Sequence, residues 1–180
     1  AKIDLEGLAP VGEESSSVTA VMYACGRCPF CARLTPQIHE AVTKGQLKGK
    51  VKLYFKLFPI RGHEHSKESG MAFLAANELG KFWEFVLYAY AHFDTFAPDE
   101  QILWAEQIGL DTVRFQELAK SPAIRAKLVA SKKEGLANKV EATPTFFIDG
   151  HKYDGELNVS ELVDVLEEAF ERARGQTHVR

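Results

Sequence analysis

The chain has only three cysteines, and all of them lie in one stretch, Cys25-Gly26-Arg27-Cys28-Pro29-Phe30-Cys31, of its 180 residues. The apolar run from Ser17 to Ala24 before it predicts a buried strand, and the run from Pro29 to Thr43 predicts a helix. In a Cys-Pro-x-Cys sequence at such a junction, the first cysteine sits at the helix N-terminus, where unpaired N–H groups and the helix dipole favour a thiolate. The second cysteine follows one turn later. The pattern therefore predicts thiol–disulfide exchange.

Composition bounds the remaining possibilities. The apolar fraction of 46% is ample for the core of one domain, or of one domain with a large insertion. The 22 basic and 25 acidic side chains are mixed along the chain and give a formal charge of −3. This balance gives no basic surface of the kind that binds nucleic acid. No apolar run approaches the roughly 20 residues of a membrane span. The clustered cysteines have no distant partners, which argues against a disulfide scaffold.

Hydrophobic periodicity predicts the order β-α-β, a helical block, and β-β-α. Residues 64 to 139 show no strand and predict about four or five helices. Asp149-Gly150 is a tight-hairpin signal, and Asn158 with Glu161 forms a capping-box pattern. The other expected elements are strands at Lys48–Lys56, Thr145–Ile148 and Lys152-Tyr153, and helices at Ser66–Leu79, Lys81–Phe93, Pro98–Ile108, Thr112–Lys120, Pro122–Lys133 and Asn158–Ala173.

This order predicts an α/β chain in three parts. Residues 1–16 are expected to form an N-terminal arm or a short leading strand. Residues 17–63 and 139–180 are expected to form the domain that carries the sheet, and residues 64–138 an inserted helical domain.

The element order and three motifs together resemble the DsbA-like proteins, which have a thioredoxin fold with a helical insertion. Cys28-Pro29-Phe30-Cys31 is similar to the Cys-Pro-x-Cys redox motif of that family. Pro36, five residues after Cys31, matches its helix-kinking proline, and the segment from Val140 to Gly150, with Thr143-Pro144-Thr145, resembles its cis-proline strand. The likeness covers nearly the whole chain from residue 17 onward.

The resemblance implies a protein disulfide oxidoreductase in which Cys28 is the nucleophile and Cys31 the resolving thiol. The offset of Pro36 supports this register, because a nucleophilic Cys25 would place Pro36 eight residues after the second cysteine rather than five. No cofactor or metal is implied beyond a redox-active Cys28–Cys31 disulfide. Thr143 and a cis Pro144 would lie beside the sulfurs and bind substrate backbone.

The surrounding residues leave several roles open. Pro29 and Phe30 lie between the paired cysteines, and Arg27 would support the thiolate if its side chain turned inward. Cys25 is interpreted either as a buried residue at the end of a strand or as an accessory thiol. Two positions depart from the family pattern. Phe30 stands where many relatives have histidine, and Met22 stands where they often have a buried acid, which implies a weaker oxidant.

The resemblance also implies the partners and the compartment. Thiol-containing substrate proteins and a separate redox partner are expected, and the location would be periplasmic or otherwise extracytoplasmic, although no signal-peptide pattern is visible. A monomeric oxidase is favoured, because the 16 residues before the first strand are too few for an added dimerisation domain.

Other functions stay open. Within the same class, a reductase or isomerase is the alternative. In other classes, the three cysteines could hold Cu(I) or Zn(II), or the chain could be a glutathione-linked enzyme. His63 and His65 flank Glu64 and are interpreted as a solvated loop or helix N-terminus rather than a metal site.

Overall fold

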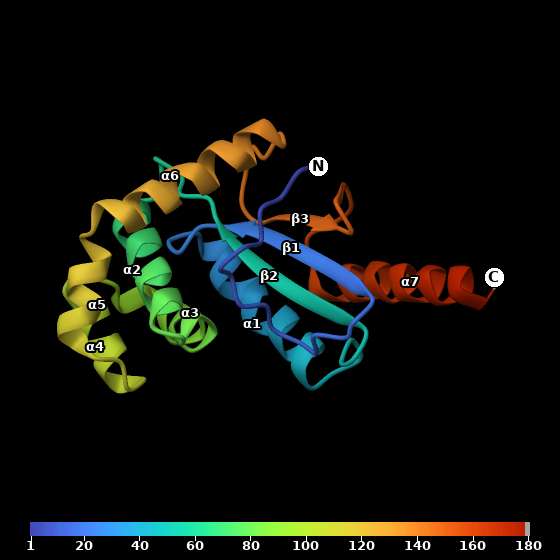
Figure 1. Cartoon of the computed structure of the whole chain (residues 1–180), viewed down its shortest axis with the longest axis horizontal. Helices are drawn as coiled ribbons and strands as arrows, with labels where there is room; N and C mark the ends of the chain where they lie inside the picture. Colours follow the sequence, from blue (N-terminus) through green and yellow to red (C-terminus); the bar gives the residue numbers. More distant parts are fainter. Residues whose placement is uncertain (179–180) are drawn as a thin grey trace.

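The computed structural model describes residues 1–178, with side chains up to residue 175. Its sheet has the strand order β2-β1-β3-β4 (Figure 1). Strand β1 pairs in parallel with β2 and antiparallel with β3, which pairs antiparallel with β4. The strands are β1 (Val18–Ala24), β2 (Val51–Leu57), β3 (Thr145–Ile148) and β4 (His151–Lys152).

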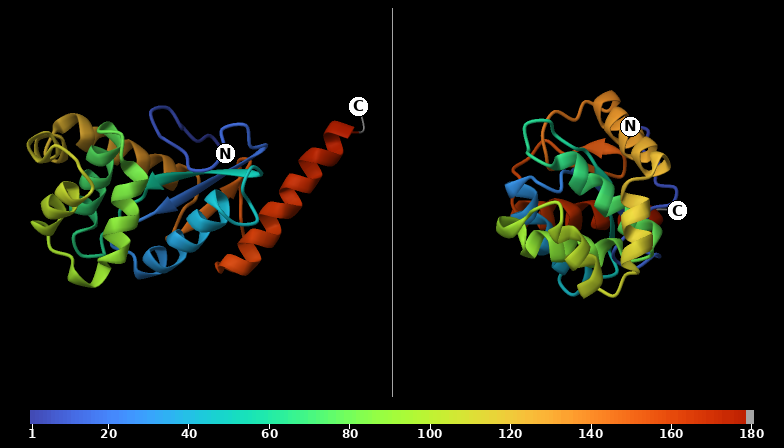
Figure 2. Two further views of the ribbon diagram at one scale, coloured as in Figure 1. Left: turned by 90° about the horizontal axis from the view of Figure 1, so that it is seen from below. Right: turned by 90° about the vertical axis from the view of Figure 1, so that its left-hand side faces the viewer.

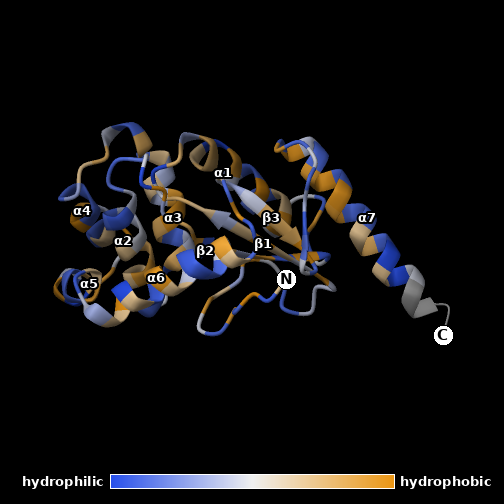
Figure 3. Ribbon diagram, turned by 90° about the horizontal axis from the view of Figure 1, so that it is seen from above, coloured by the Kyte–Doolittle hydropathy of each residue, from blue (hydrophilic) through white to orange (hydrophobic). Residues whose placement is uncertain are grey.

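Two helices cover one face of the sheet. Helix α1 (Pro29–Thr43) follows β1 and has the bounds that the sequence predicts, while α7 (Val159–His178) packs beside it. Leu162 and Leu166 of α7 are fully buried against this face, and apolar residues follow one side of the helix in Figure 3. The first turn of α7 is capped by Asn158, whose Oδ1 accepts the backbone N–H of Glu161 at 2.8 Å, as the capping pattern predicts.

Five α-helices and one 3₁₀ turn separate β2 from β3, where the sequence predicts four or five helices. They gather at the end of the sheet to which β1 and β2 point (Figure 2). Their bounds are α2 (Ser66–Glu78), α3 (Phe82–Ala91), the 3₁₀ turn (Phe93–Thr95), α4 (Glu100–Gln107), α5 (Thr112–Ala119) and α6 (Pro122–Ala137).

Helix α6 continues four residues past its predicted end at Lys133. Gly135 lies in this added turn and packs against an aromatic ring. A Cβ there would come within 2.5 Å of Phe58 Cδ2, so glycine allows the helix to pack closely on the sheet. Tertiary packing therefore outweighs the low helix propensity of glycine.

The sheet and the insertion share one hydrophobic cluster. Phe55 of β2 lies 5.9 Å from Phe73 of α2 and 5.4 Å from Phe82 of α3, between ring centroids, in edge-to-face arrangements. Such pairs add about 0.5–1.5 kcal/mol beyond the area that they bury. Because this core is continuous, it marks no boundary between the sheet-bearing part and the helical insertion. The division of the chain into these domains stays a prediction.

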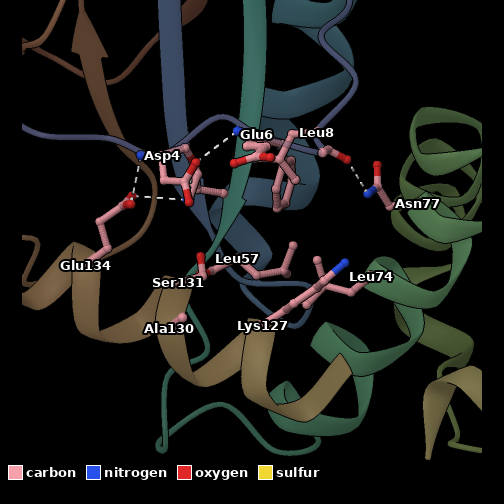
Figure 4. A pocket seen from close by; sticks show the side chains of 13 residues that line it. Asp4, Glu6, Leu8, Leu57, Leu74, Asn77, Lys127, Ala130, Ser131 and Glu134 are labelled. Atoms are coloured by element: carbon pink, nitrogen blue, oxygen red, sulfur yellow. Dashed lines mark hydrogen bonds and ion pairs between the residues drawn. The ribbon is translucent and has the colours of Figure 1, made fainter. Parts of the chain in front are cut away.

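The N-terminal arm crosses the outer side of the molecule without forming a strand of its own. One isolated bridge joins Val11 to Leu53 of β2. Figure 4 shows the arm above α2 and α6, where the backbone N–H of Asp4 donates to Glu134 at 2.9 Å and Asn77 donates to the carbonyl of Gly7 at 2.9 Å. Glu134 also pairs with the buried Lys56 at 3.1 Å, and Lys56 donates to the carbonyl of Asp4 at 2.6 Å, so both members of this ion pair hold the arm.

The hairpin after β3 turns at Asp149-Gly150, whose φ angles of +47° and +85° suit a two-residue turn of the kind that the sequence predicts. Its second strand, β4, begins at His151, one residue before the predicted start. Across the described residues, no helix combines the length and the apolar character required to cross a membrane.

Candidate active site

The first cysteine of the Cys-Pro-x-Cys motif caps helix α1. Cys28 has extended backbone angles, and its Sγ accepts the backbone N–H of Cys31 at 3.4 Å. Pro29 occupies the first helical position, where its missing N–H removes no hydrogen bond. The sulfur therefore takes the place of the usual capping oxygen and meets the positive end of the helix dipole.

The loop before β3 brings a second segment to the same sulfur. The Thr143–Pro144 peptide bond is cis, and the carbonyl oxygen of Thr143 lies 3.6 Å from Cys28 Sγ. The Thr143 hydroxyl is buried and has no hydrogen-bond partner among the described side chains and backbone. This hydroxyl is thus free to donate to a thiolate at Cys28.

These contacts make the thiol of Cys28 acidic. The pKa of Cys28 falls from 9.0 to about 5, first because the thiol of Cys31 donates a hydrogen bond to its sulfur. The Thr143 side chain and the backbone N–H groups of Cys31 and Phe30 lower the pKa further, against an opposing effect of burial. At neutral pH this sulfur is therefore a thiolate, the nucleophilic form.

Cys31 has the opposite environment. It is fully buried, and burial raises its pKa far above the usual range, with further contributions from its hydrogen bond to Cys28 and from the nearby charge of that sulfur. The two neighbouring thiols thus differ in protonation across the physiological range: one is ionised and the other holds its proton.

The third cysteine is buried at the end of β1. Cys25 has no exposed surface, and burial is the main cause of its raised pKa. The backbone N–H of Arg27 donates to its sulfur at 3.4 Å, and that of Ile60 also lowers the pKa. The three cysteines are free thiols, and no group of three or more His, Cys, Asp or Glu residues within the described part of the chain could hold a metal ion.

The side chain of Arg27 extends to the helical insertion. Its guanidinium carbon lies 4.0 Å from the ring centroid of Phe93 and 4.2 Å from that of Phe96, and Nη1 donates to the Phe93 carbonyl at 3.0 Å. Arg27 is not among the main causes that shift the pKa of Cys28. Its contacts therefore tie the active-site loop to the insertion.

Phe30 lies at the surface of the motif. Its side chain is 38% exposed, although it is large and apolar, and the guanidinium of Arg33 lies 5.6 Å from its ring. An exposed aromatic ring beside a reactive sulfur offers contact area to an incoming chain.

Two hydroxyl groups that sequence reasoning did not assign to the site lie beneath the cysteines. Tyr90 of α3 is buried, and its hydroxyl donates to the carbonyl of Cys25 at 3.0 Å. Thr35 is also buried and donates to Sδ of Met22, the residue that departs from the family pattern, at 3.7 Å. Helical spacing marks both residues only as core, and no local signal identifies their role.

A comparison with protein families gives the class. The thioredoxin family model matches residues 6–168, which is most of the chain, and the chain belongs to the thioredoxin family.

Comparison with solved structures identifies the fold more closely. Wolbachia pipientis alpha-DsbA1 is 17% identical with a TM-score of 0.82, covering 97% of this chain and 96% of that one. Bacillus subtilis BdbD is 17% identical with a TM-score of 0.81 (93% and 95% covered), and a thioredoxin-like oxidoreductase from Silicibacter pomeroyi is 24% identical with a TM-score of 0.77 (92% and 94% covered). The fold is therefore the thioredoxin-like fold with the helical insertion of DsbA-type proteins.

Curated relatives of similar sequence are much longer than this chain. The Na(+)/H(+) antiporter NhaA 3 of Salinispora tropica is 29% identical over 164 residues, which are 91% of this chain and 25% of that protein. The NhaA antiporter of Herminiimonas arsenicoxydans is 26% identical over 165 residues, with 92% and 26% covered. The chain thus spans about a quarter of the length of these relatives.

Proposed function

We propose that this protein is a thiol–disulfide oxidoreductase in which Cys28 is the nucleophile and Cys31 the resolving cysteine. One observation carries the proposal: the pKa of Cys28 is lowered to about 5 while that of its neighbour Cys31 is raised. A structural cysteine in an apolar core has a raised pKa and is inert. A depressed pKa at the helix N-terminus is the property that exchange chemistry requires.

The exchange proceeds in two displacements. In the oxidised protein, a substrate thiolate attacks Cys28 Sγ, which breaks the Cys28–Cys31 bond and forms a mixed disulfide, and Cys31 leaves as a thiolate that takes up a proton. A second substrate thiolate then attacks the substrate sulfur of the mixed disulfide and releases Cys28 as a thiolate. The substrate gains a disulfide and loses two electrons, and the protein pair gains both.

The direction proposed is oxidation of substrate thiols. Stabilising the Cys28 thiolate favours the reduced protein, which makes its disulfide a better oxidant. The pKa of about 5 at Cys28 lies between the values of about 7 for thioredoxin and about 3.5 for DsbA. We therefore expect a reduction potential between about −270 and about −120 mV, those of the same two proteins.

An extended substrate segment would bind beside the sulfur. The backbone of Thr143, whose carbonyl lies 3.6 Å from Cys28 Sγ, offers an edge to which another strand can add. The exposed ring of Phe30 would contact the segment next to its cysteine. These two contacts select for accessible, extended protein thiols.

The site is built from residues of one chain, which supports action as a monomer. A separate redox partner would reoxidise the Cys28–Cys31 pair, and an oxidising, extracytoplasmic compartment suits this direction of exchange. A reductase or isomerase is the second candidate, since it would use the same two cysteines and differ in potential.

The test uses oxidised protein and a reduced, unfolded substrate with several cysteines. Loss of substrate thiols in step with the appearance of protein thiols supports the oxidase. A potential near or below about −270 mV, measured by equilibration with dithiothreitol buffers, would favour a reductase instead. Absence of exchange in both directions would overturn the proposed function.

A further inference from the structure

A cavity of about 610 Å³ lies between the loop after β2 and the exposed side of α6. Two hydrogen bonds and one cation–π contact join its two walls. Lys132 of α6 donates to the carbonyl of Pro59 at 2.5 Å and lies 3.7 Å above the ring of Phe58, while Ser131 donates to Leu57 at 2.6 Å. The cavity is therefore formed before any ligand arrives, and little ordering cost remains for binding.

The charges around this cavity are unbalanced. Its lining carries two carboxylates, Glu64 and Glu68, and both face the imidazole of His65, at 3.5 and 3.9 Å. Four exposed cations in the lining have no ion-pair partner among the described residues: Arg61, Lys67, Arg125 and Lys133. A positive site on a chain with a formal charge of −3 favours an anionic ligand.

The spacing along α6 indicates the shape of that ligand. Arg125, Val129 and Lys133 stand four residues apart and so share one face of the helix. The two cations are separated by about 12 Å along the axis, and between them Val129 is 43% exposed. The same three residues also line a shallower hollow of about 430 Å³ on the neighbouring surface.

Two anionic groups about 12 Å apart would pair with both cations at once. An extended peptide rises about 3.3 Å per residue, so two acidic side chains four residues apart span about 13 Å. An apolar side chain midway between them would meet Val129. The arrangement therefore fits an acidic protein segment with an apolar residue between two carboxylates, rather than inorganic phosphate.

Both sides of the cavity are linked by contacts to the segment that carries the cysteines. Ile60, in the loop that forms one wall, donates its backbone N–H to Cys25. On the other side, the ring of His65 lies 5.7 Å from that of Phe96, which contacts Arg27, the residue before Cys28. A chain bound in the cavity would thus be anchored next to the loop that carries the nucleophile.

We propose that the surface formed by Arg61, Arg125, Val129 and Lys133, the α6 groove, binds an acidic segment of the protein partner that exchanges disulfides with this site. Exchange with this partner rests on the proposed function, whereas binding of an acidic peptide does not. Electrostatic attraction of this kind raises the association rate and selects among partners more than it raises affinity.

The test uses a fluorescein-labelled peptide without cysteine, with two glutamates four residues apart and a leucine midway. Fluorescence anisotropy reports its binding to the wild type and to two double variants. In the groove variant, Arg125→Glu is combined with Lys133→Glu; the control combines Lys44→Glu with Lys48→Glu, which changes the net charge equally at exposed positions near the end of α1. Circular dichroism establishes that each variant is folded.

We expect the groove variant to bind about tenfold more weakly, and the control within about twofold of the wild type. Raising the salt from about 50 to about 300 mM should weaken wild-type binding. A glutamine version of the peptide should not bind. Equal weakening in both double variants, equal binding of the glutamine peptide, or no binding to the wild type would each overturn the groove. So would sedimentation showing that a second copy of the chain occupies this face.

A second readout separates this inference from the proposed function. Exchange with hydroxyethyl disulfide, which is small and neutral, should be unchanged in the groove variant, and Cys28→Ser should keep peptide binding. Peptide binding without exchange in the wild type would overturn the function and leave the groove standing. Exchange without peptide binding would overturn the groove alone.

Discussion

The backbone N–H of Cys31 donates to the Sγ of Cys28 at 3.4 Å, so the proposed nucleophile caps the helix that carries the proposed resolving cysteine. The same geometry lets the Cys31 thiol donate to the Cys28 sulfur, which is the main cause of the lowered pKa. One turn of helix thus separates a thiol that ionises from one that does not. The predictions below follow from this arrangement.

Replacing Cys28 and replacing Cys31 should have different results. Cys28→Ser removes the thiolate and should abolish exchange. Cys31→Ser removes the group that resolves the mixed disulfide, so substrate should stay covalently attached and be visible on a non-reducing gel. Cys25→Ser serves as the control, because the buried Cys25 has a raised pKa. Loss of all exchange in Cys25→Ser, or full dithiol activity in Cys28→Ser, would contradict the assignment.

Removing the Thr143 hydroxyl should raise the pKa of Cys28. The hydroxyl is buried without a hydrogen-bond partner in the described part of the chain, and a hydrogen bond to a charged group contributes about 1.5–3 kcal/mol, or about one to two pKa units. Thiolate absorbance across a pH titration of Thr143→Val measures the shift. Thr43→Val, at the far end of α1, is the matched control, and equal pKa values in Thr143→Val and the wild type would refute the role.

The stability of the reduced protein should depend on pH through Cys28. Its pKa is about 5 in the folded state against an ordinary value of 9.0, so the folded state binds fewer protons between these values. Stability therefore rises from pH 5 toward pH 9, and the gain is lost as the pH falls to 5. Between pH 5 and pH 8, a span of three pH units, the free energy of unfolding rises by at most about 4 kcal/mol through this group.

Chemical denaturation of the reduced wild type at pH 5 and at pH 8 measures this effect. The reduced Cys28→Ser variant supplies the background, since its remaining groups titrate alike. The difference between the two proteins should grow toward pH 8. A difference that is flat or shrinks toward pH 8 would mean that the fold does not stabilise the thiolate.

Arg27→Ala should weaken the fold without changing the nucleophile. The guanidinium contacts two rings of the insertion, and cation–π contacts contribute about 0.5–2 kcal/mol. Urea denaturation should show a loss of about that size, while the pKa of Cys28 stays within error of the wild type. If the pKa of Cys28 rose by about one unit in Arg27→Ala, the result would show that Arg27 stabilises the thiolate.

The sequence predicts those parts of the fold whose signals are local. The cysteine stretch marks the junction of β1 and α1, Asp149-Gly150 marks the hairpin, and Asn158 marks the start of α7. Each depends on residues within about four positions of one another, which helical and turn geometry relate directly. The bounds of α1 are correct for this reason.

Long-range contacts account for what the sequence does not predict. Arg27 contacts Phe93, which lies 66 residues away in the 3₁₀ turn, and Tyr90 reaches Cys25 from another helix. Helix α6 continues past Lys133 because Gly135 packs on Phe58, a contact that no local pattern encodes. The α6 groove depends likewise on a loop and a helix that meet only in the folded chain.

The most direct test of the central claim is alkylation of the reduced protein from about pH 3 to about pH 9, with mass mapping of each cysteine. The account predicts that Cys28 labels alone at acidic pH, with half-maximal rate near its pKa of about 5, while Cys25 and Cys31 resist. Labelling of Cys25 before Cys28, or of Cys28 only above about pH 8, would contradict it.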